Sequence, residues 1–120
     1  MSHVSTLDTE LKDIDGIRAA CDHLNLPAPE EGTFQLFSES VSGLGIKLPG
    51  WKYPIVVDLK TGKVKFDNYN GTWGKAEELN NFQNRYLAAT TIAMARRRGL
   101  SVKEVEESAG VVRLKVRGMV

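Results

Sequence analysis

The sequence predicts an α+β fold, in which an antiparallel sheet is covered on one face by two helices. Two observations lead to this prediction. Most of the expected strands are separated by tight turns, and strands joined in this way pair antiparallel. Each of the two helical segments carries one apolar stripe, which has to be buried against another element. The expected order along the chain is β-α-β-β-β-β-α-β-β.

The composition is that of one globular domain spanning residues 1–120. Hydrophobic residues make up 42% and charged residues 26%. The 16 Lys and Arg face 15 Asp and Glu, so the net charge is +1. This balance excludes a global field that steers the protein onto nucleic acid or membrane, but it allows a local patch. Cys21 is the only cysteine, which excludes a disulfide framework and multi-cysteine zinc sites.

The first strand is expected within residues 3–11, where β-branched residues partly alternate with others. A helix follows, capped by Asp13 or Asp15, because apolar residues then recur at spacings of three and four. This stripe consists of Ile14, Ile17, Cys21 and Leu24. Pro27 and Pro29 end the helix, since proline cannot continue it.

Four strands joined as a meander are predicted in the middle of the chain. Their expected ranges are 33–38, 41–48, 53–59 and 63–67. Residues 60–62 form a hairpin turn. Residues 68–74 are predicted to form a loop, because Asn, Gly and aromatic residues alternate there.

A long helix is predicted over residues 75–98, with Gly99 as its C-terminal stop. Its inward stripe is expected to contain Leu79, Phe82, Tyr86, Ala89 and Ala93. A final hairpin pairs residues 102–107 with residues 111–117 across a turn at 108–110.

Aromatic and polar side chains on two loops form the first candidate binding site. Its members are Trp51, Tyr53, Asp67, Asn68, Tyr69 and Trp73. We expect Trp51 and Tyr53 to share one face of an extended segment. If these rings are exposed, they mark a partner or ligand site, and Trp73 or Tyr69 can stack on a base. If they are buried they belong to the core, and Asn70 or Thr72 then caps the long helix.

Basic side chains in the last quarter of the chain form the second candidate site. They are Arg96, Arg97, Arg98, Lys103, Arg113, Lys115 and Arg117, and Arg85 of the long helix is added to them. Together they can bind phosphate groups. The alternative is a solvated face neutralised within the protein. Glu104, Glu106 and Glu107 on the neighbouring strand can pair with the return strand.

Groups typical of catalysis are few. His3 and His23 are the only imidazoles, and Cys21 does not face His23, because residues two apart lie on different sides of a helix. Asp58 and Asp67 lie on opposite arms of a predicted hairpin, where they can be neighbours, and a carboxylate pair can act as acid and base or bind a metal. No glycine-rich phosphate motif is present. The sequence does not favour an enzyme, and it predicts no catalytic residue, metal site or cofactor.

The N-terminal segment lacks the basic start and apolar run of a secretory signal. The longest uncharged apolar stretch, 86–95, reaches about half a membrane span. We therefore expect a cytoplasmic protein that does not enter the membrane.

Several segments carry a family resemblance, which covers nearly the whole chain in order. They are residues 1–6, 18–21, 48–54, 67–74 and 85–86. With them the chain resembles a family of short bacterial proteins of unknown function, found in cyanobacteria and planctomycetes and related to a hypothetical conserved reading frame of algal plastids. The resemblance implies a small, soluble, intracellular protein. It also implies an accessory role beside an AAA+ ATPase, whose gene often lies nearby, and it carries over no catalytic residue.

Two function classes follow from these observations. The first is a non-enzymatic accessory or adaptor domain that docks on a protein partner, expected to be an AAA+ ATPase, with aromatic anchors. The second is a module for a nucleotide or single-stranded nucleic acid, stacked on Trp73 or Tyr69, with phosphates on Arg85 and residues 96–98. A small enzyme using Asp58, Asp67 or His3 has the least support. An exposed edge strand in the meander would also allow a homo-oligomer by sheet extension.

Overall fold

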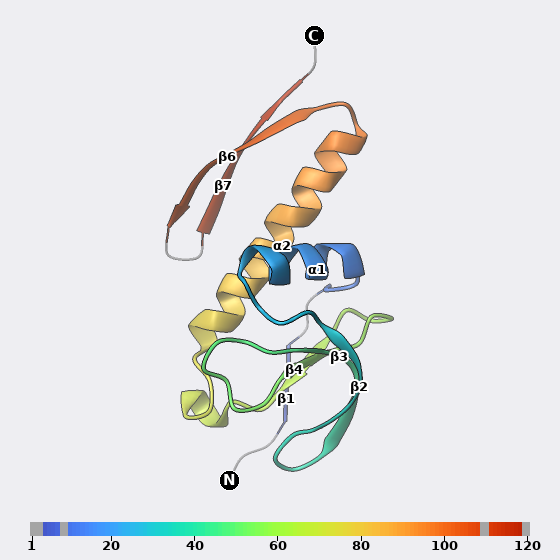
Figure 1. The fold of residues 1–120 in the computed structure, drawn as a ribbon, viewed down its shortest axis with the longest axis vertical. Coiled ribbons are helices and arrows are strands. Elements are labelled where there is room, and N and C mark those ends of the chain that lie inside the picture. Colours follow the sequence, from blue (N-terminus) through green and yellow to red (C-terminus); the bar gives the residue numbers. More distant parts are fainter. Residues whose placement is uncertain (1–3, 8–9, 109–110, 119–120) are drawn as a thin grey trace.

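The computed structural model describes residues 4–7, 10–108 and 111–118, and these confirm the α+β class (Figure 1). The described elements are β1 (Ser5–Leu7), α1 (Ile14–His23), β2 (Glu30–Gln35), β3 (Ser40–Ile46), β4 (Ile55–Val57), β5 (Val64–Phe66), a 3-10 turn (Tyr69–Gly71), α2 (Ala76–Arg97), β6 (Ser101–Ser108) and β7 (Val111–Arg117). Their order is the predicted one. The molecule is elongated, with principal extents of 56 × 28 × 23 Å.

Strands β1 to β5 form one antiparallel sheet in the order β1-β5-β4-β3-β2. The predicted meander is therefore present, and the N-terminal strand joins it beside β5. The strands are shorter than expected in the centre, since β4 covers only residues 55–57 of the predicted 53–59. Strand β2 lies at one edge and is mostly exposed, so self-association through this edge stays a prediction.

Both helices pack on one face of this sheet, as predicted. Ile17 of α1 and Phe82 of α2 are completely buried against Val57 and its neighbours. Asp13 caps α1, since its Oδ1 accepts hydrogen bonds from the amides of the first turn. Gly16 allows the two helices to touch, because a Cβ there would lie 2.7 Å from a methyl group of Thr90.

A second, smaller core lies apart from the helix-covered one. Leu36 and Val41, from the end of the β2–β3 hairpin, pack with Val56 of β4. Gly43 permits the close approach of β3 to β4 at this point, because its φ is +154° and a Cβ would lie 2.5 Å from the carbonyl oxygen of Val57. The hairpin can therefore curve back over the sheet.

The final hairpin does not join the main sheet. β6 and β7 form a two-stranded sheet of their own that lies along the C-terminal half of α2 (Figure 1). As a result α2 runs past the sheet, and its predicted inward stripe is buried only in the first half. Ala89 is half-buried and Ala93 is exposed, contrary to expectation, because both line a hollow between α1 and α2 instead of packing into the core.

Two smaller predictions were wrong. α2 begins after Lys75 without a side-chain cap, so neither Asn70 nor Thr72 caps it. Asp58 and Asp67 lie at opposite ends of the β4–β5 pair, because Val57 pairs with Val64 and Asp67 follows β5. Within the described ranges, no helix has the length and apolar content needed to span a bilayer.

Candidate functional site

Three aromatic rings gather around that of Trp73, and the four residues are called here the aromatic cluster: Phe37, Tyr53, Tyr69 and Trp73. The Trp73 ring centroid lies 4.8 Å from that of Tyr69 and 5.2 Å from that of Phe37. The Tyr53 ring meets it edge-on at 5.6 Å. The members come from three separate loops, and Phe37 is 56% and Tyr69 40% exposed. The cluster is thus an apolar surface open to solvent.

A lysine borders this cluster. The Nζ of Lys52 lies 4.7 Å from the ring centroid of Trp73 and 5.6 Å from that of Tyr53. Its backbone amide also donates a hydrogen bond to the Trp73 carbonyl at 2.8 Å, which joins two of the loops. A cation held against aromatic faces in this way is attracted by their quadrupoles. The aromatic cluster therefore offers an apolar surface with one positive charge at its border.

The loop that carries Tyr69 and Trp73 is fixed by its own polar side chains. Buried Asp67 accepts a hydrogen bond from the Tyr69 amide at 3.3 Å. Asn68 donates to the Gly74 carbonyl at 3.2 Å, and its own carbonyl accepts from the Trp73 amide at 2.9 Å. The structure thus places Asp67 and Asn68 as supports of the aromatic cluster.

The same loop holds an uncommon backbone conformation. Tyr69 and Asn70 both have positive φ, at 46° and 51°. A left-handed conformation at a large aromatic residue costs on the order of 1 kcal/mol or more. It persists because the surrounding hydrogen bonds determine the loop, and it holds the Tyr69 ring at the surface.

Trp51 does not belong to the aromatic cluster, contrary to the prediction that it shares a face with Tyr53. Its indole lies over Gly74 and meets Phe66 edge-on at 5.8 Å, on the side of the main core. Its Nε1 donates to the Lys75 carbonyl at 3.1 Å. The segment turns here instead of running extended, since the Trp51 amide bonds the Leu48 carbonyl. Trp51 therefore anchors the loop to the start of α2.

Arg85 is engaged within the protein. It is 4% exposed, and its two terminal nitrogens bind both carboxylate oxygens of Glu104 at 3.0 and 3.2 Å. These hydrogen bonds hold the pKa of the Glu104 carboxyl below its ordinary value, with a smaller electrostatic contribution from His23. The pair fastens β6 to α2, so Arg85 has a structural role in this conformation.

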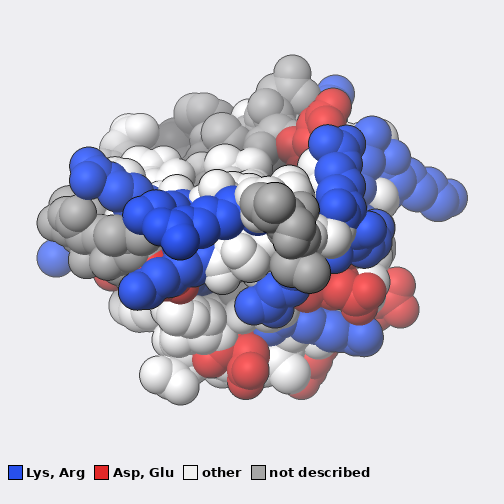
Figure 2. Space-filling model, turned by 90° about the horizontal axis from the view of Figure 1, so that it is seen from above, with Lys and Arg blue, Asp and Glu red and all other residues white. Residues whose placement is uncertain are grey.

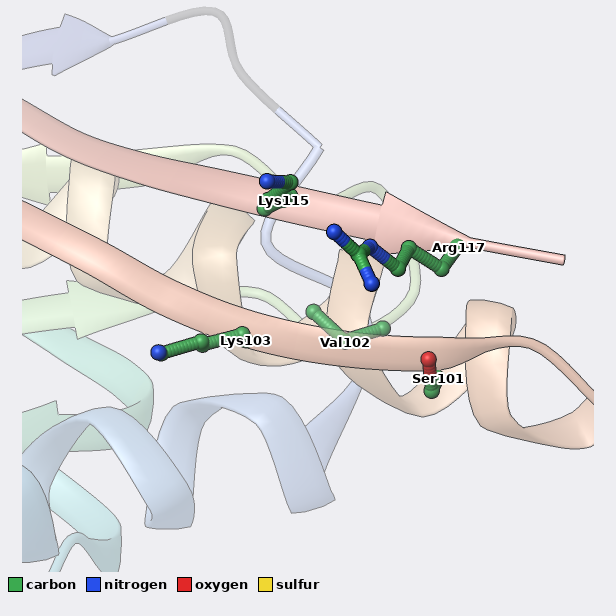
Figure 3. Close-up of a pocket in the computed structure, with 5 residues that line it drawn as sticks. All are labelled: Ser101, Val102, Lys103, Lys115 and Arg117. Atoms are coloured by element: carbon green, nitrogen blue, oxygen red, sulfur yellow. The ribbon is translucent and has the colours of Figure 1, made fainter.

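The hairpin carries a basic hollow of about 480 Å³, lined by Ser101, Val102, Lys103, Lys115 and Arg117 (Figure 3). We predicted that glutamates of β6 neutralise the cations of the return strand β7, and this is wrong for Lys115 and Arg117. Lys103 pairs in register with Lys115, and Ser101 with Arg117. Glu104 lies opposite Leu114, and only Arg113 has a glutamate, Glu106, as its register partner. An irregularity between residues 104 and 106 shifts the register and causes this difference.

The aromatic and basic regions lie at opposite ends of α2. Trp73 precedes the helix, whereas exposed Arg96, Arg97 and Arg98 lie at its C-terminal end. A helix of 22 residues is roughly 33 Å long. The structure therefore does not bring together the stacking residues and the arginines that the sequence suggested for one nucleotide site.

Cys21, the one thiol of the chain, is buried in the core. Burial raises the pKa of the Cys21 thiol to about 11, which leaves it protonated and unreactive at neutral pH. No group of three His, Cys, Asp or Glu that could hold a metal ion is found among them. His3 lies outside the described residues.

Two members of the sites escaped the sequence analysis. Phe37 lies in a turn, where a large aromatic residue indicates a binding surface, and Lys52 lies between Trp51 and Tyr53 in the sequence.

Comparisons of the chain with protein-family models, with curated proteins and with solved structures gave no match.

Proposed function

We propose that this protein is a docking domain that binds a protein partner through the aromatic cluster. The observation that supports this most directly is the exposure of Phe37 and Tyr69 around Trp73. Large aromatic residues supply most of the binding energy at many interfaces. Here they are held by fixed loops, so little conformational freedom is lost on binding.

The chemistry of the aromatic cluster suggests what the partner presents. An apolar or aromatic side chain would cover Trp73, and a neighbouring carboxylate would meet the ammonium group of Lys52. The family resemblance makes an AAA+ ATPase the first partner to test. Asp67 and Asn68 would contribute indirectly, by holding the loop.

The test compares two double variants that lose similar exposed apolar area. The first is Phe37→Ser with Tyr69→Ser, in the aromatic cluster. The second, a control, is Leu87→Ser with Met94→Ser, two side chains of α2 that are 58% and 53% exposed. Each is titrated with purified AAA+ ATPase from the same host. We expect the first to weaken binding by at least about tenfold, because removal of a hot-spot residue costs about 2 kcal/mol or more, and the control to bind like the wild type.

The fluorescence of Trp73 reports directly on the site. A Trp51→Phe background leaves Trp73 as the only tryptophan, and docking over its ring should shift its emission to shorter wavelength. Equal binding by both double variants, without a change in Trp73 emission, would contradict the proposal. Quenching of Trp73 by a nucleotide or single-stranded oligonucleotide would instead support the alternative, in which a base stacks on Trp73 or Tyr69.

A further inference from the structure

The balanced net charge hides a segregation of charge along the chain. Residues 96–117 contain seven Lys and Arg but only three Glu. The rest of the chain contains nine Lys and Arg and twelve Asp and Glu. The positive residues of the C-terminal part belong to the hairpin and to the end of α2, and the view of this end shows Lys and Arg side chains over much of its visible surface, with acidic side chains beside and between them (Figure 2). This end can therefore carry a local positive field despite the overall charge of +1.

The pairing of β6 and β7 gives one face of the hairpin its charge. Residues directly opposite in an antiparallel pair share a face, so Lys103, Lys115 and Arg117 lie together with Ser101. The alternate positions face α2: Glu104 binds Arg85 there, and Val102 and Leu114 are half-buried. The basic side chains thus point away from the body of the protein and are exposed.

The pairing of Lys103 with Lys115 lowers the stability of the hairpin when no anion is bound. Like charges directly opposite across two strands destabilise the pair. Among the side chains that the structure describes, three cations, one hydroxyl and Val102 line the basic hollow, and none of these is a carboxylate. The guanidinium of Arg117 points across toward β6 (Figure 3). An anion bound in the basic hollow would relieve the repulsion between Lys103 and Lys115.

We propose that this face of the hairpin binds the sugar–phosphate backbone of a nucleic acid. Lys115 and Arg117 are two residues apart on one strand, which separates them by about 7 Å, a spacing suited to successive phosphates. A two-stranded ribbon is also one of the shapes that fit the major groove of a duplex. Arg96, Arg97 and Arg98 extend the basic surface at the same end of the molecule.

The shape of the site favours a nucleic acid over a membrane surface. A phosphate backbone is a narrow ridge that can enter a hollow between cations. Peripheral membrane binding typically uses an apolar helix face that inserts between lipids. Because the contacts fall on phosphates, the binding would be salt-dependent and largely independent of base sequence. This site is separate from the aromatic cluster, so it does not depend on the docking function proposed above.

The test measures fluorescence anisotropy of a short labelled DNA duplex, titrated with the full chain from about 50 to 200 mM salt. The triple variant Lys103→Gln, Lys115→Gln and Arg117→Gln removes three charges from the basic hollow. The matched control, Lys60→Gln, Lys63→Gln and Lys65→Gln, removes three exposed charges from the β4–β5 region. Circular dichroism verifies that both variants fold.

We expect the wild type and the control to bind within about twofold of each other, and the hairpin variant to bind at least about tenfold more weakly. The slope of log K against log salt should fall in magnitude by about three in the hairpin variant, roughly one for each phosphate that is no longer neutralised. Lys103→Arg with Lys115→Arg keeps the charges and should retain binding. The Phe37→Ser and Tyr69→Ser variant should bind DNA normally.

Three outcomes would overturn the proposal. They are no binding by the wild type at the lowest salt, an equal loss in the two triple variants, or binding only to vesicles that contain anionic phosphatidylserine. The last outcome would assign the basic hollow to a membrane surface.

Discussion

The body of the protein, which consists of the five-stranded sheet and the two helices, is stabilised by different contacts from the C-terminal hairpin of β6 and β7. In the body, Ile17, Val57 and Phe82 are completely inaccessible to solvent. In the part of the hairpin whose side chains are described, none is fully buried, and Val111 and Val116 are 62% and 46% exposed. The hairpin relies on half-buried apolar contacts with α2 and on the pair of Arg85 and Glu104. Stability should therefore be graded along the chain, with the hairpin the first part to open.

The largest effect is expected from a change in the main core. Phe82→Ala should lower the free energy of unfolding by about 3–5 kcal/mol, because it removes a completely buried ring and leaves a cavity between α2 and the sheet. Denaturant titration measures this loss. Leu87→Ala, on the exposed side of the same helix, should change it by less than about 0.5 kcal/mol. Similar losses in both variants would mean that α2 is not packed as described.

A smaller and more local effect is expected at the hairpin. Glu104→Gln removes the carboxylate from buried Arg85 and should cost about 2 kcal/mol, a value typical of hydrogen bonds between charged groups. Amide hydrogen exchange should become faster in β6 and β7, whereas β4 and β5 keep their protection. Glu39→Gln, in an exposed turn, is the control. A uniform change across the molecule would show that hairpin and body unfold as one unit.

The same ion pair predicts a pH dependence. The folded state lowers the pKa of Glu104 below 4.5, so its contribution to stability is present above that value and is lost as the pH falls through the lowered pKa. Between about pH 7 and pH 3, the melting temperature of the wild type should fall more steeply than that of Glu104→Gln. Parallel curves for the two proteins would contradict this assignment.

At neutral pH, the smallest effect on stability is expected at Cys21, because its thiol is protonated in both the folded and the unfolded state. Its thiol has a pKa of about 11 in the folded protein, so at about pH 8 a thiol reagent should react only when the body opens. Reaction should be fast after unfolding in denaturant, which serves as the control. Because the unfolded thiol ionises near 9.0, stability should fall as the pH rises from there toward 11. Rapid reaction of the native protein would indicate that α1 is poorly packed.

Periodicity along the chain predicted most of the fold. The stripes of both helices and the turns of the meander indicated the α+β class, the order of elements and the burial of Ile17, Cys21 and Phe82. These features are local, because residue spacing decides which side chains share a face. Which distant element covers a face is not local. For this reason the separation of the hairpin from the main sheet was not predicted, nor was the exposure of Ala93 at the hollow between α1 and α2.

The candidate sites were predicted less completely. Tyr53, Tyr69 and Trp73 do meet, but Trp51 separates from them because a turn at residues 48–51 reverses its direction. The charge of the hairpin depended on an irregular register that no residue pattern specified. Spacing predicts a strand, but a one-residue shift in pairing decides whether a lysine faces a glutamate or another lysine.

The length of α2 has a consequence for how two occupants would be combined. Its continuous backbone hydrogen bonding fixes the separation of its ends at roughly 33 Å, so the helix keeps the two proposed binding sites at a constant distance. A protein held at Trp73 and a nucleic acid held at Arg117 would not collide, and neither would need to leave for the other to arrive. When both are bound, the protein partner and the nucleic acid are held near each other, which raises the effective concentration of one for the other. This gain needs no new contact and depends only on the distance between the two sites.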